Sequence, residues 1–186
     1  MIKKTLFLVI ITTFLGCKDE PLLKPYGFLR LDLPQVGYEK WSDNCGFSFH
    51  KPISAKIEYS KIDSCFFNIF YPSLNAKVHC SYIPVNGHLK EIIDQEYKLR
   101  EKHNQFSTRV RERVYHDNLN NVHALLFYIS GTQAATPLQF FITDSTKHFF
   151  RGTLYFNTSP NNDSLATAID FIRADMDTLV ESFVWK

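Results

Sequence analysis

The chain has 186 residues, with 21 Lys and Arg against 19 Asp and Glu. Removal of an N-terminal signal containing Lys3 and Lys4 leaves 19 basic residues (21 minus 2) against 19 acidic ones. A near-neutral chain without a basic stripe argues against nucleic-acid binding, and the remaining length, about 170 residues, suits one domain with a core rich in Phe and Tyr.

The first predicted segment is a lipoprotein signal peptide over residues 1–16. The stretch from Leu6 to Leu15 is apolar but too short to cross a hydrocarbon core of about 30 Å as a helix. Phe14-Leu15-Gly16-Cys17 resembles a bacterial lipobox, so Cys17 would become the first mature residue and carry the lipid anchor. Two or more acyl chains anchor a protein stably where one does not. A plain secretion signal with an incidental cysteine is the alternative.

The residues after Cys17 indicate where in the cell envelope the lipoprotein is expected. An aspartate directly after the lipidated cysteine retains lipoproteins in the inner membrane, and this position holds Lys18. We therefore expect the outer membrane, with its periplasmic face favoured over the cell surface. Lys18-Asp19-Glu20 also resembles the signal that brings some lipoproteins of one bacterial phylum to the surface. The alternative interpretation is that these three charged residues are only part of a solvated linker and carry no export signal.

A tether over residues 17–27 is predicted to lead into a single globular α/β domain at residues 28–186. Alternation and apolar runs in its first part predict strands at 28–33, 47–49, 56–59, 65–71 and 76–85, and helical spacing predicts an amphipathic helix at 88–104. Because Cys65 to Tyr71 is almost continuously apolar, this strand is expected to be covered on both faces. On the strand at 76–85, Val78, Cys80 and Tyr82 should share the buried side.

The second part continues with strands predicted at 109–115, 123–130, 138–143 and 148–157, of which 123–130 should be central and the last two should form a hairpin. Capping residues at 161–164 begin a final helix, and its apolar stripe should pack flat on a sheet. This order favours an α+β fold with a mainly antiparallel sheet packed by helices. The layout resembles the Mog1/PsbP-like α/β/α sandwich.

The cysteines other than Cys17 allow two interpretations. In an oxidising compartment a Cys45–Cys65 disulfide is the expected bridge, because each residue precedes a short apolar strand; buried free thiols are the alternative. His50, His79 and His88 are scattered among the cysteines without zinc-ligand spacing, so we expect no metal site.

Two histidines are the candidates for chemistry. Asp144, Ser145 and His148 share one tight turn, where they cannot readily align as a catalytic triad, so turn formation is the better interpretation. His103 lies on the apolar face of its predicted helix, as a hydrogen-bonded core histidine would. No catalytic residue and no cofactor beyond the lipid on Cys17 are therefore predicted.

Several blocks resemble one family. They are Lys24 to Pro34, Cys65 to Pro72, Ala76 to Tyr82, the closing Glu181 to Lys186, and above all the hairpin block LQFFITDSTKHFFRGTLYFN at 138–157. Together they are similar to the gliding-motility lipoprotein GldD family. The resemblance implies a lipoprotein needed for gliding and for the associated type IX secretion system, with Cys17 as the lipid-bearing residue.

The leading hypothesis is thus a non-enzymatic, lipid-tethered protein that acts by contact with other gliding and type IX secretion proteins, with no small-molecule substrate. Gln139, Asp144, His148 and Arg151 are polar among the aromatic residues of the hairpin and form its candidate partner surface. The alternatives are an envelope hydrolase with His103 or His148 as base, and a small-ligand or lipid carrier with a pocket in the aromatic core.

Overall fold

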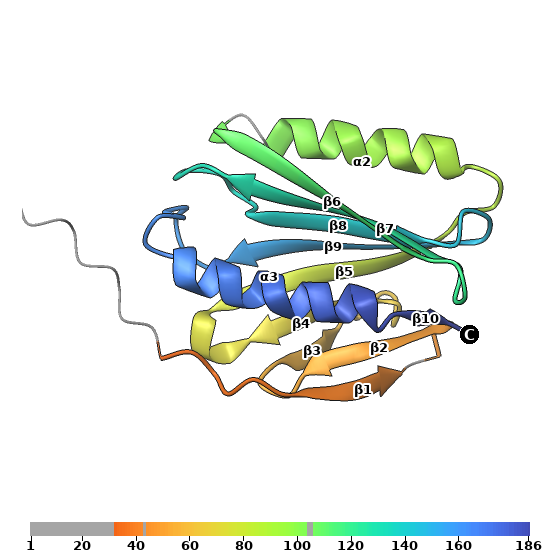
Figure 1. Cartoon of the computed structure of the whole chain (residues 1–186), viewed down its shortest axis with the longest axis horizontal. Coiled ribbons are helices and arrows are strands. Elements are labelled where there is room, and N and C mark those ends of the chain that lie inside the picture. The colour runs from red at the N-terminus through yellow and green to blue at the C-terminus, as the bar shows by residue number, and fades with distance from the viewer. Residues whose placement is uncertain (1–31, 43, 104–105) are drawn as a thin grey trace, which may run out of the picture.

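A seven-stranded antiparallel sheet organises the part of the chain that the computed structural model describes, residues 32–42, 44–103 and 106–186 (Figure 1). Its strand order is β3-β4-β5-β9-β8-β7-β6. The strands are β3 (Lys56–Tyr59), β4 (Phe66–Tyr71), β5 (Ala76–Pro84), β6 (Arg109–Asp117), β7 (Val122–Ser130), β8 (Leu138–Thr143) and β9 (His148–Phe156).

A smaller sheet and two helices complete the architecture. The small sheet has the order β1-β2-β10, formed by β1 (Tyr38–Ser42), β2 (Phe47–Pro52) and β10 (Val184–Trp185), and both of its pairings are antiparallel. Helix α2 (Leu89–His103) lies on one face of the large sheet, whereas helix α3 (Ala166–Glu181) and the small sheet lie on the other (Figure 1). A short 3₁₀ turn, η1 (Pro72–Leu74), connects β4 to β5. The fold is therefore of the α+β class with a mainly antiparallel sheet.

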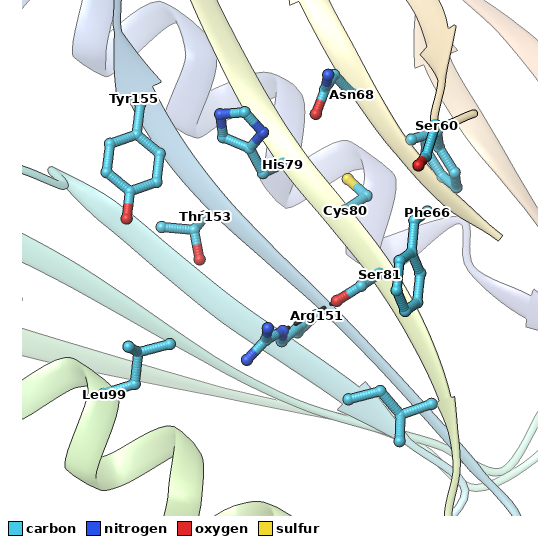
Figure 2. Close-up of a pocket in the computed structure, with 12 residues that line it drawn as sticks. Ser60, Phe66, Asn68, His79, Cys80, Ser81, Leu99, Arg151, Thr153 and Tyr155 are labelled. Carbon is cyan, nitrogen blue, oxygen red and sulfur yellow. Dashed lines mark hydrogen bonds between the residues drawn. The ribbon is translucent and has the colours of Figure 1, made fainter. Parts of the chain in front are cut away.

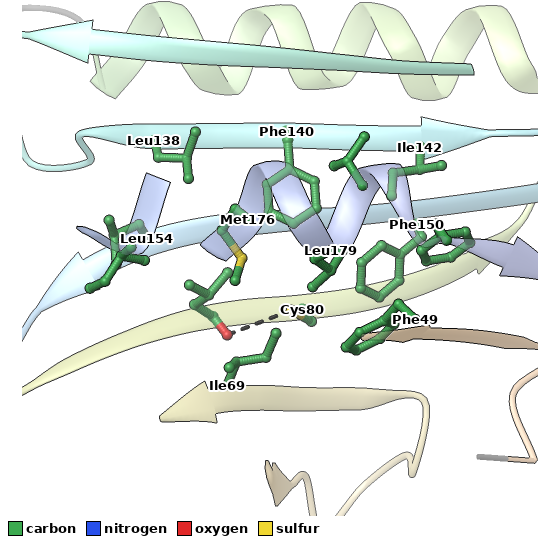
Figure 3. Packing of buried hydrophobic residues seen from close by; sticks show 14 of the residues in the cluster. Phe49, Ile69, Cys80, Leu138, Phe140, Ile142, Phe150, Leu154, Met176 and Leu179 are labelled. Carbon is green, nitrogen blue, oxygen red and sulfur yellow. Dashed lines mark hydrogen bonds between the residues drawn. The ribbon is translucent and has the colours of Figure 1, made fainter. Parts of the chain in front are cut away.

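The inner face of the large sheet, which packs against α3 and the small sheet, carries the main core (Figure 3). Phe150 lies near its centre, with its ring centroid 5.0 Å from that of Phe47 and 5.4 Å from that of Phe183. Gly152 is required beside it, because a Cβ there would lie 2.3 Å from the Phe140 ring. Phe150 and Gly152 thus alternate as a large and a small residue on the inner side of β9, and the small residue leaves space for the ring of Phe140.

Helix α3 is fixed to this core by both apolar and polar contacts. Its predicted stripe is confirmed, with Ile169, Ile172, Met176 and Leu179 all buried. The carboxylate of the buried Asp175 accepts hydrogen bonds from Tyr38 Oη at 2.9 Å and Tyr71 Oη at 3.1 Å. Burial raises the pKa of Asp175, although the two phenols lower it in part. One side chain of α3 therefore connects β1, β4 and the helix.

The outer face is covered only in part. Helix α2 packs on a second apolar cluster built around Phe127, Ile129, Phe141 and Phe149, on the β7-β8-β9 part of the sheet. Every described side chain of α2 remains at least partly accessible, unlike those of α3. The other half of this face, on β4, β5 and the distal part of β9, has no helix above it (Figure 1).

Three strand predictions need correction. The strand predicted at 28–33 falls largely outside the described residues, and Asp32 and Leu33 are not in a strand; the first strand is β1, where only Trp41 is buried, so the sequence carries no alternation there. Strand β4 is buried on its inner side only, because α2 does not extend over it. Strand β7 is interior but next to the edge strand β6, and β9 holds the central position.

Candidate functional site

Two predicted residues lie beyond what the structure describes. Cys17, the predicted lipid-attachment site, falls outside the described residues. His103 ends α2, but its side chain is not among those described. Among the described residues, no helix is long and apolar enough to cross a membrane. In the same part of the chain, no three His, Cys, Asp or Glu side chains are grouped as metal ligands would be.

The four polar residues proposed as one hairpin surface are separated by the structure. Successive side chains of a strand point to opposite faces, and His148 and Arg151 are an odd number of positions apart on β9. His148 therefore lies on the inner side at the strand's start, and Arg151 lies on the outer face. Gln139 is buried and donates a 2.7 Å hydrogen bond to Thr136 Oγ1. These residues do not form a single contact surface.

Asp144 organises the turn between β8 and β9. Its Oδ1 accepts hydrogen bonds from the backbone N–H groups of Thr146, Lys147 and His148 at 2.8 to 3.0 Å. Partial burial raises the pKa of this carboxyl, but the three amides outweigh that effect and lower its pKa to about 2. Its carboxylate thus holds the turn, and Ser145 adopts the positive φ of 65° that the turn requires.

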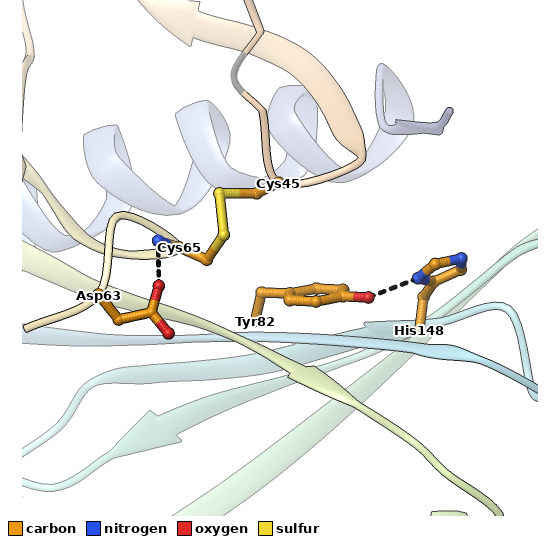
Figure 4. The surroundings of a disulfide bond; sticks show 5 residues. All are labelled: Cys45, Asp63, Cys65, Tyr82 and His148. Carbon is orange, nitrogen blue, oxygen red and sulfur yellow. Dashed lines mark hydrogen bonds between the residues drawn. A yellow bond between two sulfur atoms is a disulfide. The ribbon is translucent and has the colours of Figure 1, made fainter.

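His148 is held by packing and by one phenol (Figure 4). Its Nδ1 lies 2.7 Å from Tyr82 Oη, and its ring stacks on Trp185 with centroids 5.1 Å apart. The partner of the imidazole is therefore a tyrosine of β5, and the carboxylate of Asp144 contacts only the backbone of His148. This arrangement fits a structural histidine on the inner face of the sheet, at the start of β9, better than the base of a catalytic triad.

The cysteines are divided between a bridge and a buried thiol. Cys45 and Cys65 form a disulfide with Cα atoms 5.6 Å apart, which joins the loop between β1 and β2 to the start of β4 (Figure 4). Asp63 Oδ1 accepts a 2.8 Å hydrogen bond from the backbone N–H of Cys65 and fixes the preceding loop. Cys80 is buried, and its burial raises the pKa of the thiol far above its ordinary value.

A groove of about 530 Å³ lies on the uncovered half of the outer face (Figure 2). Side chains of β4, β5 and β9 form its floor, and Leu99 of α2 forms one wall. Phe66 is 39% exposed at the opposite rim. The groove exists because α2 lies over the β6-β7-β8-β9 half of the sheet and leaves β4 and most of β5 uncovered. The outward side chains of β4, β5 and the end of β9 therefore remain accessible.

Arg151 lies at the centre of the groove (Figure 2). Its Nη1 is 2.5 Å from Glu96 Oε1 of α2, and its Nε donates to Ser81 Oγ at 2.9 Å. This ion pair joins the helix to β5 and β9 and sets the width of the groove. Because Arg151 keeps about a third of its side chain exposed, it can still donate to a bound group.

An aromatic pair lines the other end of the groove. His79 and Tyr155 meet edge to face, with ring centroids 5.4 Å apart. Desolvation lowers the pKa of His79, and the charge of Lys77 lowers it further, so the imidazole is neutral at neutral pH. Desolvation also raises the pKa of Tyr155. Neutral rings beside a guanidinium can stack and donate hydrogen bonds, which suits recognition of another polypeptide.

Only Arg151 of this groove was among the predicted site residues. The sequence places His79 among the cysteines without zinc-ligand spacing, and it predicts strands but no site role for Phe66 and Tyr155. The available signal was the alternation on β5, where Lys77, His79 and Ser81 share the polar side. That pattern identifies the outward face of β5. Which part of this face is left without a helix above it depends on how far α2 extends, and the pattern does not show that.

Comparisons with known proteins give one family and one fold. The family described as "Gliding motility lipoprotein GldD" matches residues 18–185. Among solved structures, the chain is similar to the solution structure of cyanobacterial PsbP (CyanoP) from Synechocystis sp. PCC 6803, with 14% sequence identity and a TM-score of 0.50. That match covers 88% of this chain and 99% of the cyanobacterial chain, and at this identity it concerns the fold alone. A comparison with curated proteins found no match.

Proposed function

The chain belongs to the gliding motility lipoprotein GldD family, and from this premise we propose that it is a lipid-anchored accessory protein of the gliding and type IX secretion machinery. It acts by contact with other envelope proteins of that machinery and performs no catalysis. The observation that carries the proposal is the extent of the family match, which includes every described strand and helix.

The proposed anchor is Cys17. The family match covers residues 18–185, which is nearly all of the mature chain predicted to begin at Cys17. A lysine at position 18 favours the outer membrane over inner-membrane retention, with the domain on the periplasmic side. Anchoring raises the local concentration of the domain at the membrane, and a modest interface then suffices for assembly.

The outer-face groove is the proposed contact surface, and its occupant is a segment of another envelope protein of the machinery. It combines an exposed ring at Phe66, the His79–Tyr155 pair and the guanidinium of Arg151. Interfaces between proteins are enriched in such aromatic and arginine side chains. The groove lies on the opposite side of the sheet from α3, and Phe67 and Cys80 of the main core also border it.

The two alternative functions are less well supported by the same geometry. A carrier would need a hollow among the aromatic residues, but the rings of the inner core contact one another at centroid distances of 4.8 to 6.4 Å. A hydrolase using His148 would need its imidazole beside a nucleophile, whereas that ring is stacked on Trp185 and bonded to Tyr82.

Deletion and complementation test the role. In a deletion strain we expect a type IX cargo to accumulate inside the cell and colony spreading to stop, with both restored by the wild-type gene. Complementation with Cys17→Ala should release the domain from membranes and restore neither activity. Leu119→Ala is the control, because it truncates a side chain that is 95% exposed and lies outside both the predicted anchor and the groove. Normal secretion and spreading after deletion would contradict the proposal.

A further inference from the structure

A second cleft lies on the inner side of the sheet's free edge, away from the outer-face groove. It has a volume of about 360 Å³ and lies between the edge strand β6, its neighbour β7 and helix α3. Its lining consists of Arg109, Arg111, Tyr128, Ser130 and Arg173. Three guanidinium groups thus converge on a single cleft, and no acidic residue contributes to its lining.

The register explains why these groups meet. Arg109 pairs with Ser130 and Arg111 pairs with Tyr128 across the β6–β7 ladder, so all four side chains share the face toward α3. The guanidinium carbons of Arg111 and Arg173 lie 4.6 and 5.5 Å from the centre of the Tyr128 ring. The ring therefore holds two cations near each other at the floor of the cleft.

Arg113, on the same strand, has carboxylate partners of the kind that the lining of the cleft lacks. Arg113 is paired with both Asp177 and Glu181 of α3, at 2.5 Å each. By contrast, within the described residues neither Arg109 nor Arg111 has a carboxylate partner. The charge at the middle of β6 is thus neutralised by α3, whereas the start of the strand presents two cations without a carboxylate partner.

Arg173 adds a third, more deeply set charge. Its Nη2 donates to the backbone oxygens of Ile129 and Pro137, which fixes the guanidinium, and its Nη1 lies 3.2 Å from the exposed carboxylate of Asp170. Burial lowers the pKa of Arg173, the carboxylate of Asp170 raises it in part, and the nearby charge of Arg111 lowers it further. Arg173 is therefore a fixed source of positive potential that an added anion would stabilise.

We propose that this cleft binds a phosphate group, with Arg109, Arg111 and the hydroxyl of Ser130 as its direct donors and Arg173 as the electrostatic support. Guanidinium groups match the oxygens of a phosphate with paired, charge-assisted hydrogen bonds. A dianionic or monoanionic phosphate would also offset the net charge of the lining.

The position of the cleft indicates a membrane headgroup as one source of the phosphate. Strand β6 begins, β7 ends and α3 begins at the end of the domain where the described chain starts at Asp32, on the left in Figure 1. Fifteen residues separate Asp32 from Cys17 (32 minus 17), a reach of at most about 50 Å. This source depends on the anchor proposed above, whereas phosphate binding itself does not.

Two binding measurements on the mature chain, residues 17–186 with Cys17→Ala, test the site and its source. The first is titration with inorganic phosphate, followed by NMR of the backbone amides of residues 109–111 and 130 and of the arginine Nε–H groups. The second is sedimentation with vesicles of phosphatidylglycerol in phosphatidylcholine, with pure phosphatidylcholine vesicles as the neutral reference.

The test variant is Arg109→Gln with Arg111→Gln, and the control is Lys56→Gln with Lys61→Gln. The control removes the same charge from exposed residues on and beside β3, at the other edge of the sheet. We expect the arginine variant to weaken binding about tenfold or more, because charge-assisted hydrogen bonds are lost. The lysine control should change binding by at most about twofold.

The possible outcomes distinguish a soluble phosphate from a lipid headgroup, and two of them would refute phosphate binding at this cleft. Shifts confined to the cleft on adding inorganic phosphate, without vesicle binding, support the site and assign it a soluble phosphate. Arginine-dependent binding to the anionic vesicles assigns it a lipid headgroup. Equal weakening by the two variants, or no binding of either probe, would overturn the proposal. Neither measurement depends on secretion or spreading, so failure here is distinguishable from failure of the proposed cellular role.

Discussion

The two faces of the large sheet are covered in different ways. On the inner face, α3 and the small sheet bury large side chains completely, and α3 alone contributes seven buried residues. On the outer face, α2 covers only the β6-β7-β8-β9 half, and each of its described side chains stays partly accessible. Most stabilising burial therefore lies on the inner face, and surface changes on the outer face should leave the fold intact.

Truncation of one apolar side chain on each face gives the largest expected contrast. Phe150→Ala removes a fully buried ring at the centre of the inner core and should lower the free energy of unfolding by about 4 kcal/mol. Leu99→Ala, in the partly accessible wall of the groove, should lower it by about 1 kcal/mol. Urea unfolding of the two variants measures the difference. Equal losses would contradict the assignment of stability to the inner face.

Removal of the disulfide should have the next largest effect, because it joins the small sheet to the large one. Its cysteines are 20 positions apart in sequence, and closing a loop of this length stabilises the folded state by about 3 kcal/mol. We therefore expect Cys45→Ala with Cys65→Ala to lower the free energy of unfolding by that amount. A reductant should destabilise the wild type similarly and leave the double variant unchanged. A wild type insensitive to reduction would count against a structural role for the bridge.

The smallest expected effect is the pH dependence of the β8–β9 turn. The pKa of Asp144 is about 2 when folded, against about 3.9 in an unfolded chain. Its stabilising contribution is therefore present above about pH 4 and is lost as the pH falls to about 2. Because this carboxyl is partly accessible, we expect Asp144→Asn to cost only about 1 kcal/mol at neutral pH. Unfolding measured across this pH range should show the two proteins converging in acid; a constant difference would contradict the assignment.

The sequence predicted the elements with strong local patterns. The β8–β9 hairpin has two β-rich runs around a polar turn, and the stripe on α3 repeats at steps of three and four residues, so both were identified with nearly correct bounds. The α+β class and the resemblance to PsbP followed from the order of those elements. The GldD family is confirmed by the match over residues 18–185.

The features that depend on tertiary packing could not be predicted. Strand β1 buries only Trp41, so its sequence resembles a loop. The one-sided burial of β4 depends on how far α2 extends. The separation of His148 from Arg151, by contrast, follows from strand alternation alone and could have been predicted from the sequence. The arginine cleft needed the β6–β7 register, which places Arg109 and Arg111 beside residues of β7.

Secretion of a type IX cargo by outer-face variants tests the central claim most directly. The deletion strain is complemented with Phe66→Ala and His79→Ala together, which truncates two accessible side chains of the groove. The matched control, Leu119→Ala with His50→Ala, truncates an exposed apolar residue and an exposed histidine elsewhere. We predict that the groove variant accumulates to normal levels but secretes little cargo, whereas the control secretes normally. Full secretion by the groove variant at normal abundance would contradict the assignment of function to the outer face.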